Sequence, residues 1–363
     1  MAVFENMIQR SHEQVTFFSD PHSGLKGIVA IHNTTLGPSL GGCRMWQYES
    51  EEEALVDVLR LSKGMTYKAA ISGLNLGGGK AVIIGDSKKE KSETLFRSFG
   101  RFVEGLGGRY ITAEDVGTSV KDMEWVRTET KHVTGISRAL GGSGDPSVVT
   151  AYGVYIGMKA AVKSKLNKNS LKGLKIGVQG LGHVGMTLVD YLAKDGAILY
   201  VNDIDQNSID KAVKDYNAIS VGLDEIYGLD VDIFAPCALG AILNDKTIPQ
   251  LKCSIVAGAA NNQLENSHRH GKSLMSRGIL VAPDYVINAG GLINVSNELE
   301  GYNRDRAFNQ AEGIYDTLMA IFKRSELEDI PTNIASDYLA EERIRMLGEL
   351  KSIYTSSGKK IRI

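Results

Sequence analysis

The sequence predicts an α/β protein of two domains, one of which is built on a mostly parallel sheet. Three observations predict this class. The chain has 363 residues, the length of about two ordinary domains. From about residue 150 onward, helical stretches alternate with short apolar runs, as in proteins with a parallel sheet. A glycine-rich motif, IGVQGLGHVG at 176–185, joins one such run to the next helix.

Strands and helices mix in the first third of the chain. The apolar runs GIVAIHNTT (27–35) and KAVIIGD (80–86) predict strands, and GGRYITAED (107–115) predicts a strand that ends in a turn. Residues 51–62 have leucine and valine at helical spacing. Ser119 followed by Asp122 is typical of a helix N-cap.

A polar, glycine-rich stretch at 140–147, LGGSGDPS, predicts a hinge or domain boundary. Helices are expected in the stretches TAYGVYIGMKAAVKSKL and MTLVDYLAKDG, and strands in LKIGVQ, ILYVND, VDIFAPCA, SIVAGAA and GILVAPDYV. Apolar residues from Ala307 to Phe322 predict one helix, and another follows Pro331. We expect a first domain of residues 1–140 plus 331–363 and a second domain of 141–330, with the last helices returning to the first domain or contacting another subunit.

Composition and charge exclude several classes of protein. Hydrophobic residues make up 43% and charged residues 23%, which is ordinary for a globular chain. A net charge of −2 gives no reason to expect nucleic acid or an anionic membrane as a partner. The first residues lack the apolar centre of a signal peptide, and no apolar run is long enough for a membrane span. Three separated cysteines indicate neither disulfides nor a zinc site, so we expect a cytoplasmic protein.

The glycine motif predicts a dinucleotide site. Gly180, Gly182 and Gly185 would supply a tight turn, room for a pyrophosphate and close helix–strand packing. The helix N-terminus that follows favours phosphate. Asp203, at the end of the next strand, can accept hydrogen bonds from a ribose 2′-hydroxyl and would repel a 2′-phosphate, so NAD is preferred over NADP. Asp205 is the alternative acid. We also expect cofactor contacts from Leu181, His183, Val184, Ala238 and Asn261.

A second motif predicts the reacting site. In GLNLGGGKAVIIGD, three glycines precede Lys80, which indicates close approach of a small molecule to the backbone. If the segment folds back as a loop, Lys68 and Lys80 can line one cleft, and each charge would lower the pKa of the other lysine. A carboxylate at the end of the strand RYITAED could move protons to and from Lys80. Glu114 and Asp115 are both candidates for that carboxylate.

Motifs spread over nearly the whole chain, from about Glu13 to about Glu349, carry a family resemblance. They are GPSLGGCRM, SKGMTYKAAISGLNLGGGKAVIIGD, AEDVGT, GSGDPS, VQGLGHVG, GAANNQL and APDYVINAGGLINVSNELEGYNR. Together they resemble the superfamily of glutamate, leucine, phenylalanine and valine dehydrogenases, and they look most like its leucine branch. The resemblance implies conversion of an L-amino acid, NAD⁺ and water to a 2-oxo acid, ammonium and NADH. It also implies a cleft between a substrate-binding, oligomer-forming domain and a Rossmann-type NAD-binding domain.

The resemblance assigns roles to residues of this sequence. The lysine of GGGK, here Lys80, is the catalytic one, and the aspartate of AEDVG, here Asp115, relays protons. The lysine of MTYK, here Lys68, and Asn262 hold the substrate carboxylate. Thr150, Asp145 and Pro146 resemble the segment beside the nicotinamide. Large symmetric homo-oligomers, often octamers, are usual in this family.

The substrate side chain is expected to be aliphatic. Glutamate-specific relatives carry a lysine immediately before the early glycine pair, whereas Leu40 precedes Gly41 and Gly42 here, and burying an unpaired carboxylate against leucine is unfavourable. Leu40, Met65, Leu292 and Val295 are the expected pocket residues. Leucine and valine differ too little to be distinguished by sequence. Gly42 and Gly291 leave room, so a preference for phenylalanine or tryptophan stays open.

Two other functions are alternatives to an amino-acid dehydrogenase. A 2-hydroxy acid dehydrogenase would call for a histidine acid/base, and no histidine has a catalytic-looking context. A non-catalytic NAD-binding regulator would not need Lys68, Lys80 and Asp115 together. His268 and His270 fall on an expected exposed helix, and no metal site is predicted. Cys237 and Cys253, in apolar runs, are expected to be inert core thiols.

Overall fold

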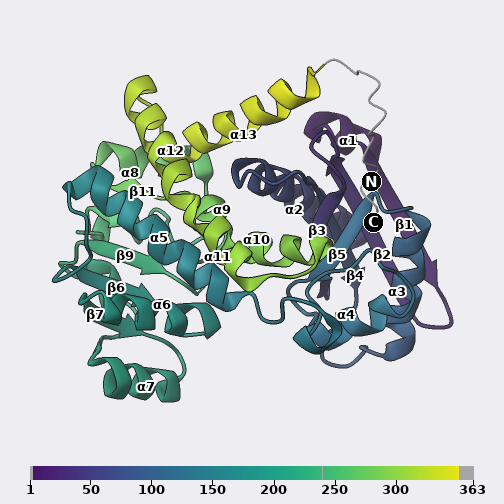
Figure 1. The fold of residues 1–363 in the computed structure, drawn as a ribbon, viewed down its shortest axis with the longest axis horizontal. Helices are drawn as coiled ribbons and strands as arrows, with labels where there is room; N and C mark the ends of the chain where they lie inside the picture. The colour runs from purple at the N-terminus through teal and green to yellow at the C-terminus, as the bar shows by residue number, and fades with distance from the viewer. Residues whose placement is uncertain (1–2, 239, 351–363) are drawn as a thin grey trace. The chain divides into compact units, whose positions relative to one another are not determined.

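The computed structural model describes residues 3–238 and 240–350, which form two compact units (Figure 1). The first unit comprises the described residues up to Asp145, then Val295–Asn303, then those from Ala340 on. The second comprises Pro146–Asn294 and Arg304–Leu339. The division expected from the sequence, 1–140 plus 331–363 and 141–330, differs in three places, since residues 141–145 belong with the first unit. Residues 295–303 belong with the first unit, and residues 331–339 belong with the second.

The first unit contains a five-stranded mixed sheet in the order β1-β2-β4-β3-β5 among the described residues. β1 and β2 are antiparallel, as are β2 and β4, whereas β3 is parallel to both β4 and β5. β1 and β3 were not anticipated from the sequence. The elements are α1 (Val3–Arg10), β1 (Gln14–Asp20), β2 (Leu25–Asn33), β3 (Ser39–Trp46), α2 (Glu51–Ile71), β4 (Gly77–Ile84), α3 (Glu93–Gly105), β5 (Tyr110–Glu114) and α4 (Val120–Arg127).

Helices cover both faces of this sheet. One apolar core joins α3 and α4 to one face through residues such as Phe96, Phe99 and Met123. A second core joins α2 to the other face through Leu55, Val58 and Val82. The predicted N-cap of α4 is confirmed: Ser119 and Asp122 form a reciprocal capping box.

The glycines before Lys80 form part of strand β4 and are buried, rather than forming an open loop. A Cβ atom at Gly78 would lie 2.1 Å from the backbone nitrogen of Thr66 on α2. A Cβ atom at Gly79 would lie 2.7 Å from the ring of Tyr110. We expected a small molecule to approach these glycines closely. At the Cβ positions of Gly78 and Gly79 that expectation is wrong, because α2 and the Tyr110 ring occupy the space there.

The described residues of the second unit form a six-stranded sheet in the order β11-β10-β9-β6-β7-β8, and the strand pairs among these residues are all parallel. This is the strand order of a doubly wound nucleotide-binding fold, and it confirms the predicted strand–helix alternation. The elements are α5 (Ser147–Leu166), β6 (Lys175–Gln179), α6 (His183–Lys194), β7 (Ile198–Asn202), α7 (Gln206–Tyr216), β8 (Ile219–Ser220), β9 (Ile233–Pro236), β10 (Ile255–Val256), α8 (Ser267–Ser276), β11 (Leu280–Val281), α9 (Asp284–Ile287), α10 (Gly290–Ser296), α11 (Arg304–Glu312), α12 (Ile314–Glu328) and α13 (Thr332–Gly348).

The terminal helices differ from the expectation in one respect. The single helix expected from Ala307 to Phe322 is two helices, α11 and α12, which meet at Gly313, a residue type that weakens a helix interior. The helix expected after Pro331 is α13. From Ala340 on it belongs with the first unit, where Arg343 donates to the carbonyl oxygens of Ala70, Gly73 and Leu74 at the end of α2. Among the described residues, no helix is long and apolar enough to cross a membrane.

The contact between Gly78 and α2 gives a testable prediction of stability. Gly78→Ala forces a methyl group against the backbone of Thr66, which cannot move without displacing α2, so we expect a loss of about 3 kcal/mol in the free energy of unfolding. Gly64→Ala is the matched control, because Gly64 lies in α2 with open space at its Cβ position. This change should stabilise by about 0.5–1 kcal/mol. Urea denaturation of both variants measures the two effects, and equal stabilities would contradict the close contact.

Candidate active site

Lys80 lies within β4, on the face of the first unit's sheet that α2 covers. Gly78 and Val82, two residues away on either side, pack against α2, and side chains two apart on a strand share a face. The Lys80 side chain is only 6% exposed. A buried ammonium group is unfavourable unless an opposite charge accompanies it. Asp115 supplies that charge, with Oδ2 at 3.0 Å from Lys80 Nζ.

Asp115 reaches Lys80 across an intervening strand. It follows β5, Lys80 lies on β4, and β3 lies between these two strands. A Cβ atom at Gly42, on β3, would lie 2.4 Å from the Glu114 carbonyl oxygen and 2.8 Å from Asp115 Cβ. The absence of a side chain at Gly42 therefore allows Asp115 to lie beside the lysine. The Glu114 backbone and the Asp115 side chain fill the room that we expected at Gly42 for a large substrate side chain.

Glu114, the alternative acid, lies among other carboxylates. Burial raises the pKa of Glu114, and the negative charges of Asp145, Asp122 and Glu298 raise it further. Burial also raises the pKa of Asp115, but the positive charges of Lys80 and Arg44 outweigh this effect and hold it below its usual value. Asp115 is therefore the carboxylate that pairs with Lys80.

Arg44 is a third charged member of this cluster, and sequence reasoning missed it. Its Nε donates to Asp115 Oδ2 at 3.0 Å, and its Nη1 donates to Asp57 Oδ2 on α2 at 2.9 Å. The available signal was the sequence SLGGCRMW. An arginine between Cys43 and Met45, in what proves to be a buried strand, requires a partner of opposite charge.

The other substrate-binding candidates of the first unit belong to β3 and α2. Met65 Cγ is 3.2 Å from the position that a Gly41 Cβ atom would take, so α2 and β3 meet there. Lys68 belongs to the last turn of the same helix. Leu40, on β3, is 1% exposed. These residues therefore come from the two elements that flank Lys80, and their contact with substrate remains a prediction.

Three further candidates come from later segments of the chain. Leu292, in the second unit, and Val295, counted with the first, are both buried. Asn262 is exposed and has φ +51°, a conformation that few residues other than glycine adopt. The neighbouring Gln263 fixes this turn, because its buried side-chain amide donates to the carbonyl oxygens of Gly258 and Ala260. Contact of Leu292 and Val295 with the substrate side chain, and of Asn262 with the substrate carboxylate, remains a prediction.

In the second unit, each glycine of the motif 180–185 has a distinct environment. Gly180 has φ +96° and forms the turn after β6. A Cβ atom at Gly185 would lie 2.0 Å from the Gly180 carbonyl oxygen, so this glycine lets α6 pack closely on the turn. A Cβ atom at Gly182 would meet no described atom within 4 Å. The turn therefore has open space where a pyrophosphate would approach the first N–H groups of α6, and these residues fit a dinucleotide.

The two acidic candidates after β7 have different partners. Asp203 accepts the backbone N–H of Leu181 in the glycine turn and that of Asp205. Asp205 is the N-cap of α7 and accepts from the backbone N–H groups of Asn207 and Ser208. Asp203 is thus the acid in contact with the glycine turn, whereas Asp205 has a structural role in α7.

The remaining cofactor candidates are distributed around the sheet of the second unit. Ala238, after β9, lies 2.7 Å from the position of a Gly180 Cβ atom, so it borders the glycine turn. His183 and Val184 begin α6. Asn261 Oδ1 accepts from the side-chain amide of Asn288 at 2.7 Å.

Thr150 lies in the first turn of α5, where its hydroxyl group donates to the Pro146 carbonyl oxygen at 2.9 Å. Its Oγ1 is also 2.9 Å from where a Gly291 Cβ atom would lie, so the space expected at Gly291 borders Thr150. Asp145 precedes this segment and ends the first unit's main stretch. Contact of Thr150, Pro146 and Asp145 with a nicotinamide remains a prediction.

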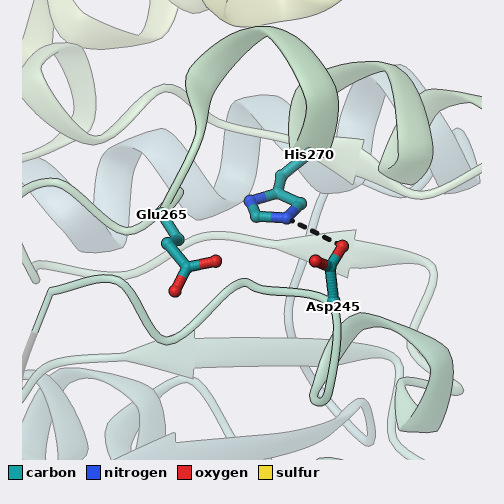
Figure 2. Close-up of side chains that lie close together, drawn as sticks. All are labelled: Asp245, Glu265 and His270. Carbon is teal, nitrogen blue, oxygen red and sulfur yellow. Dashed lines mark hydrogen bonds and ion pairs between the residues drawn. The ribbon is translucent and has the colours of Figure 1, made fainter.

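A group of side chains in the second unit, Asp245, Glu265 and His270, has the composition of a metal site. Figure 2 shows the side chains of His270, Asp245 and Glu265 near one another, with a dashed line between His270 and Asp245. His270 Nδ1 accepts the backbone N–H of Asn266, and its Nε2 lies 3.2 Å from Asp245 Oδ1 and 3.3 Å from Arg269 Nη2. Arg269 pairs with Asp245 at 2.6 Å. These contacts attach α8 to the preceding loop.

The fold and these two sites define a class. A doubly wound sheet with a glycine turn and an adjacent aspartate is typical of dehydrogenases that use a nicotinamide dinucleotide. The buried Lys80–Asp115 pair, in a separate unit, supplies groups for acid–base chemistry.

Comparison with known proteins gives the family. Residues 12–132 match the model of the Glu/Leu/Phe/Val dehydrogenase dimerisation domain, and residues 198–338 match that of the Glutamate/Leucine/Phenylalanine/Valine dehydrogenase domain. The chain belongs to this family of amino-acid dehydrogenases.

Individual relatives agree with this assignment. The chain is 55% identical over 361 residues to leucine dehydrogenase of Thermoactinomyces intermedius, covering 99% of this chain and 98% of the relative. It is 49% identical over 349 residues to phenylalanine dehydrogenase of Caldalkalibacillus thermarum, covering 95% and 94%. The crystal structure of L-tryptophan dehydrogenase from Nostoc punctiforme superposes with a TM-score of 0.85 at 48% identity, covering 95% of this chain and 99% of that one.

The environments of the motif glycines predict separable effects on cofactor binding and stability. Gly182→Ala adds a methyl group only where a pyrophosphate would approach, so the dissociation constant for NADH should rise by about tenfold or more while the melting temperature stays unchanged. Gly185→Ala, its control, drives a methyl group into the Gly180 carbonyl and should lower the melting temperature by several degrees. Fluorescence titration with NADH and thermal unfolding measure both. Unchanged NADH affinity in Gly182→Ala would contradict the site.

Proposed function

We propose that this protein catalyses the NAD-dependent, reversible oxidative deamination of branched-chain aliphatic L-amino acids, with leucine preferred and valine and isoleucine also accepted. The observation that carries the proposal is the buried ion pair between Lys80, on a strand covered by α2, and Asp115. This pair occurs in a chain that is 55% identical to a leucine dehydrogenase over nearly its whole length. A 2-hydroxy acid dehydrogenase is disfavoured because no histidine lies in this cluster. The intact pair disfavours a non-catalytic NAD-binding regulator.

Lys68, Lys80 and Asp115 each have a role in this proposal. Lys68 binds the substrate carboxylate together with Asn262. A nicotinamide cofactor held at the glycine turn of residues 180–185 would supply the acceptor for the hydride that leaves Cα of the amino acid. Lys80 then orients the water that attacks the resulting iminium carbon and stabilises the charge that develops on the new oxygen. Asp115, ionised beside two cations, accepts the proton released by this water and returns one to the leaving amine.

The proposed preference for aliphatic substrates comes from Leu40, Met65, Leu292 and Val295. A glutamate side chain would bring a second carboxylate against Leu40, which offers no partner, at a cost of about 2 kcal/mol or more. Phenylalanine is the second candidate, since relatives named for aromatic substrates are 48–49% identical. The higher identity to leucine dehydrogenases, and the filled space at Gly42, favour the smaller substrates.

The proposed cofactor is NAD rather than NADP. Asp203 lies against the glycine turn and carries a negative charge where a 2′-phosphate would approach. We further propose a homo-oligomer, with an octamer as the family resemblance implies, and a cytoplasmic location, which the three free thiols of Cys43, Cys237 and Cys253 favour.

The proposed reaction has a direct test. Purified protein is incubated with NAD⁺ and, in turn, leucine, valine, isoleucine, phenylalanine, glutamate and 2-hydroxyisocaproate, and NADH is followed by absorbance. Leucine should give the highest kcat/KM, and the glutamate value should be lower by at least about a hundredfold. Production of NADH from none of the amino acids would refute the proposal, and production from the hydroxy acid alone would favour the competing class.

The role of Lys80 predicts a loss confined to turnover. Lys80→Ala removes the group that orients water, so kcat should fall by about a thousandfold or more, while the affinity for NADH is unchanged because the cofactor site lies in the second unit. Lys89→Ala serves as the control, since this lysine is paired with Asp86 on the surface and its side chain is 81% exposed. Steady-state kinetics and NADH titration measure both. A kcat close to that of the wild type would reject the assigned role.

Asp203 predicts the cofactor preference. Asp203→Ala removes the negative charge beside the glycine turn, so the ratio of kcat/KM for NAD to that for NADP should fall about tenfold or more. Asp205→Ala removes an N-cap and should reduce stability by about 1 kcal/mol without changing the ratio. The two cofactors are compared at saturating leucine. If only Asp205→Ala alters the ratio, the acidic residue has been assigned wrongly.

A further inference from the structure

The Asp115 carboxylate is shared between two cations in the first unit. Lys80 Nζ and Arg44 Nε both lie 3.0 Å from the same oxygen, Oδ2. The three side chains come from three different strands or strand ends, β4, β3 and the end of β5, so the sheet itself sets their spacing. The side chains of Arg44 and Asp115 are only 21% and 23% exposed, which limits the screening of these charges by water.

Arg44 is itself held in a fixed orientation. Its Nη1 donates to Asp57 Oδ2 at 2.9 Å, and the Tyr48 hydroxyl group donates to the same oxygen at 2.8 Å. Arg60 Nη2 donates to the other oxygen, Asp57 Oδ1, at 2.8 Å. Asp57 and Arg60 both belong to α2. The guanidinium group of Arg44 therefore bridges two carboxylates, one after β5 and one on α2, and only a planar group with several donors can do this.

The charges alternate along this row: Lys80, Asp115, Arg44, Asp57 and Arg60. We propose that Arg44 is a positioning residue, which fixes the Asp115 carboxylate beside Lys80 and keeps it ionised, and that Asp57 is the anchor that aims Arg44. This inference rests on the proposed function, in which Asp115 accepts a proton from the attacking water. It adds a requirement that the Lys80–Asp115 pair alone does not contain.

Other ionisable groups also surround Asp115. Burial raises the pKa values of the Cys43 thiol on β3 and of the Tyr48 and Tyr110 hydroxyl groups, so all three stay neutral. Burial and nearby carboxylates raise the pKa of the preceding residue, Glu114, and on α2 Asp57 and Arg60 continue the row of charges beyond Arg44. Arg44 and Lys80 are therefore the cations in direct contact that determine when Asp115 takes up a proton.

The sign of the pH effect follows from this arrangement. Burial raises the pKa of Asp115, and the Lys80 and Arg44 charges lower it by more. Replacing Arg44 with a neutral residue removes one of the two opposing charges, so the pKa of Asp115 rises. A reaction that needs the carboxylate then loses activity at a higher pH than in the wild type, which moves the acidic limb of the kcat profile upward.

The test compares Arg44→Gln, Arg44→Lys and a matched control, Arg101→Gln, in the full-length protein. Arg101 also pairs with a carboxylate of the first unit, Glu129, at 2.9 Å, but it is mostly exposed and does not touch Asp115. With leucine and NAD⁺, Arg44→Gln should lower kcat at least about tenfold and move the acidic limb up by about one pH unit. Arg44→Lys keeps the charge but not the bridge, so the limb should stay near its wild-type position while kcat falls. Arg101→Gln should match the wild type.

A second readout separates this inference from the proposed function. In protein with ¹³C-labelled aspartate, the infrared carboxylate band that disappears in Asp115→Asn is followed against pH, and Arg44→Gln should shift its midpoint upward. If the wild-type protein deaminates no amino acid but Arg44→Gln still moves the band midpoint upward, the proposed function is refuted and the role of Arg44 is supported. A folded Arg44→Gln variant with wild-type kcat, acidic limb and band midpoint overturns the inference. Should Arg44→Gln not fold, Asp57→Asn replaces it, and a wild-type kcat in that variant overturns the inference as well.

Discussion

A lysine ammonium group within a buried strand can be retained only with an opposite charge in contact, and in this protein that charge comes from two strands away. Asp115 reaches Lys80 because Gly42, on the strand between them, has no side chain to block the approach. The same requirement extends outward. Asp115 needs Arg44, Arg44 needs Asp57, and Asp57 lies on α2, which can approach the sheet only because Gly78 is also a glycine. Much of the first unit is thus arranged around one buried cation.

This arrangement explains why the sequence was easier to interpret for the second unit than for the first. A glycine motif between a strand and a helix has one common structural explanation, and each of its glycines has the environment that this explanation requires. The run Gly77–Gly79 has several explanations. We inferred ligand access from it, whereas Gly78 and Gly79 accommodate Thr66 and Tyr110. A local pattern cannot distinguish a glycine that faces a ligand from one that faces a helix, because that depends on which distant segment packs there.

The candidate active site, like the first unit, could be predicted from the sequence only in part. Lys80 and a neighbouring acid could be identified from their motifs, since both lie beside glycines or at a strand end. The residues alone left the choice between Glu114 and Asp115 open, and only the family resemblance indicated Asp115. The choice depends on which of two consecutive side chains faces Lys80, and in the structure Asp115 is in contact with it. Arg44 was missed because β3 was not recognised as a strand: the glycine pair within SLGGCRMW resembles a turn. Once β3 is known to be buried, an arginine within it demands a partner, and Asp115 and Asp57 are within reach.

The last helix has a consequence for how the chain acquires its structure. The first unit is completed only by residues from Ala340 on, where Arg343 binds three backbone carbonyls at the end of α2, the helix that carries Lys68. The whole second unit is inserted before that point. A nascent chain emerging from the ribosome therefore makes Lys68, Lys80 and Asp115 before the second unit, yet the carbonyls at the end of α2 wait for a segment that is synthesised after that unit. Local folding during translation should therefore form the inserted unit before the end of α2 is fixed.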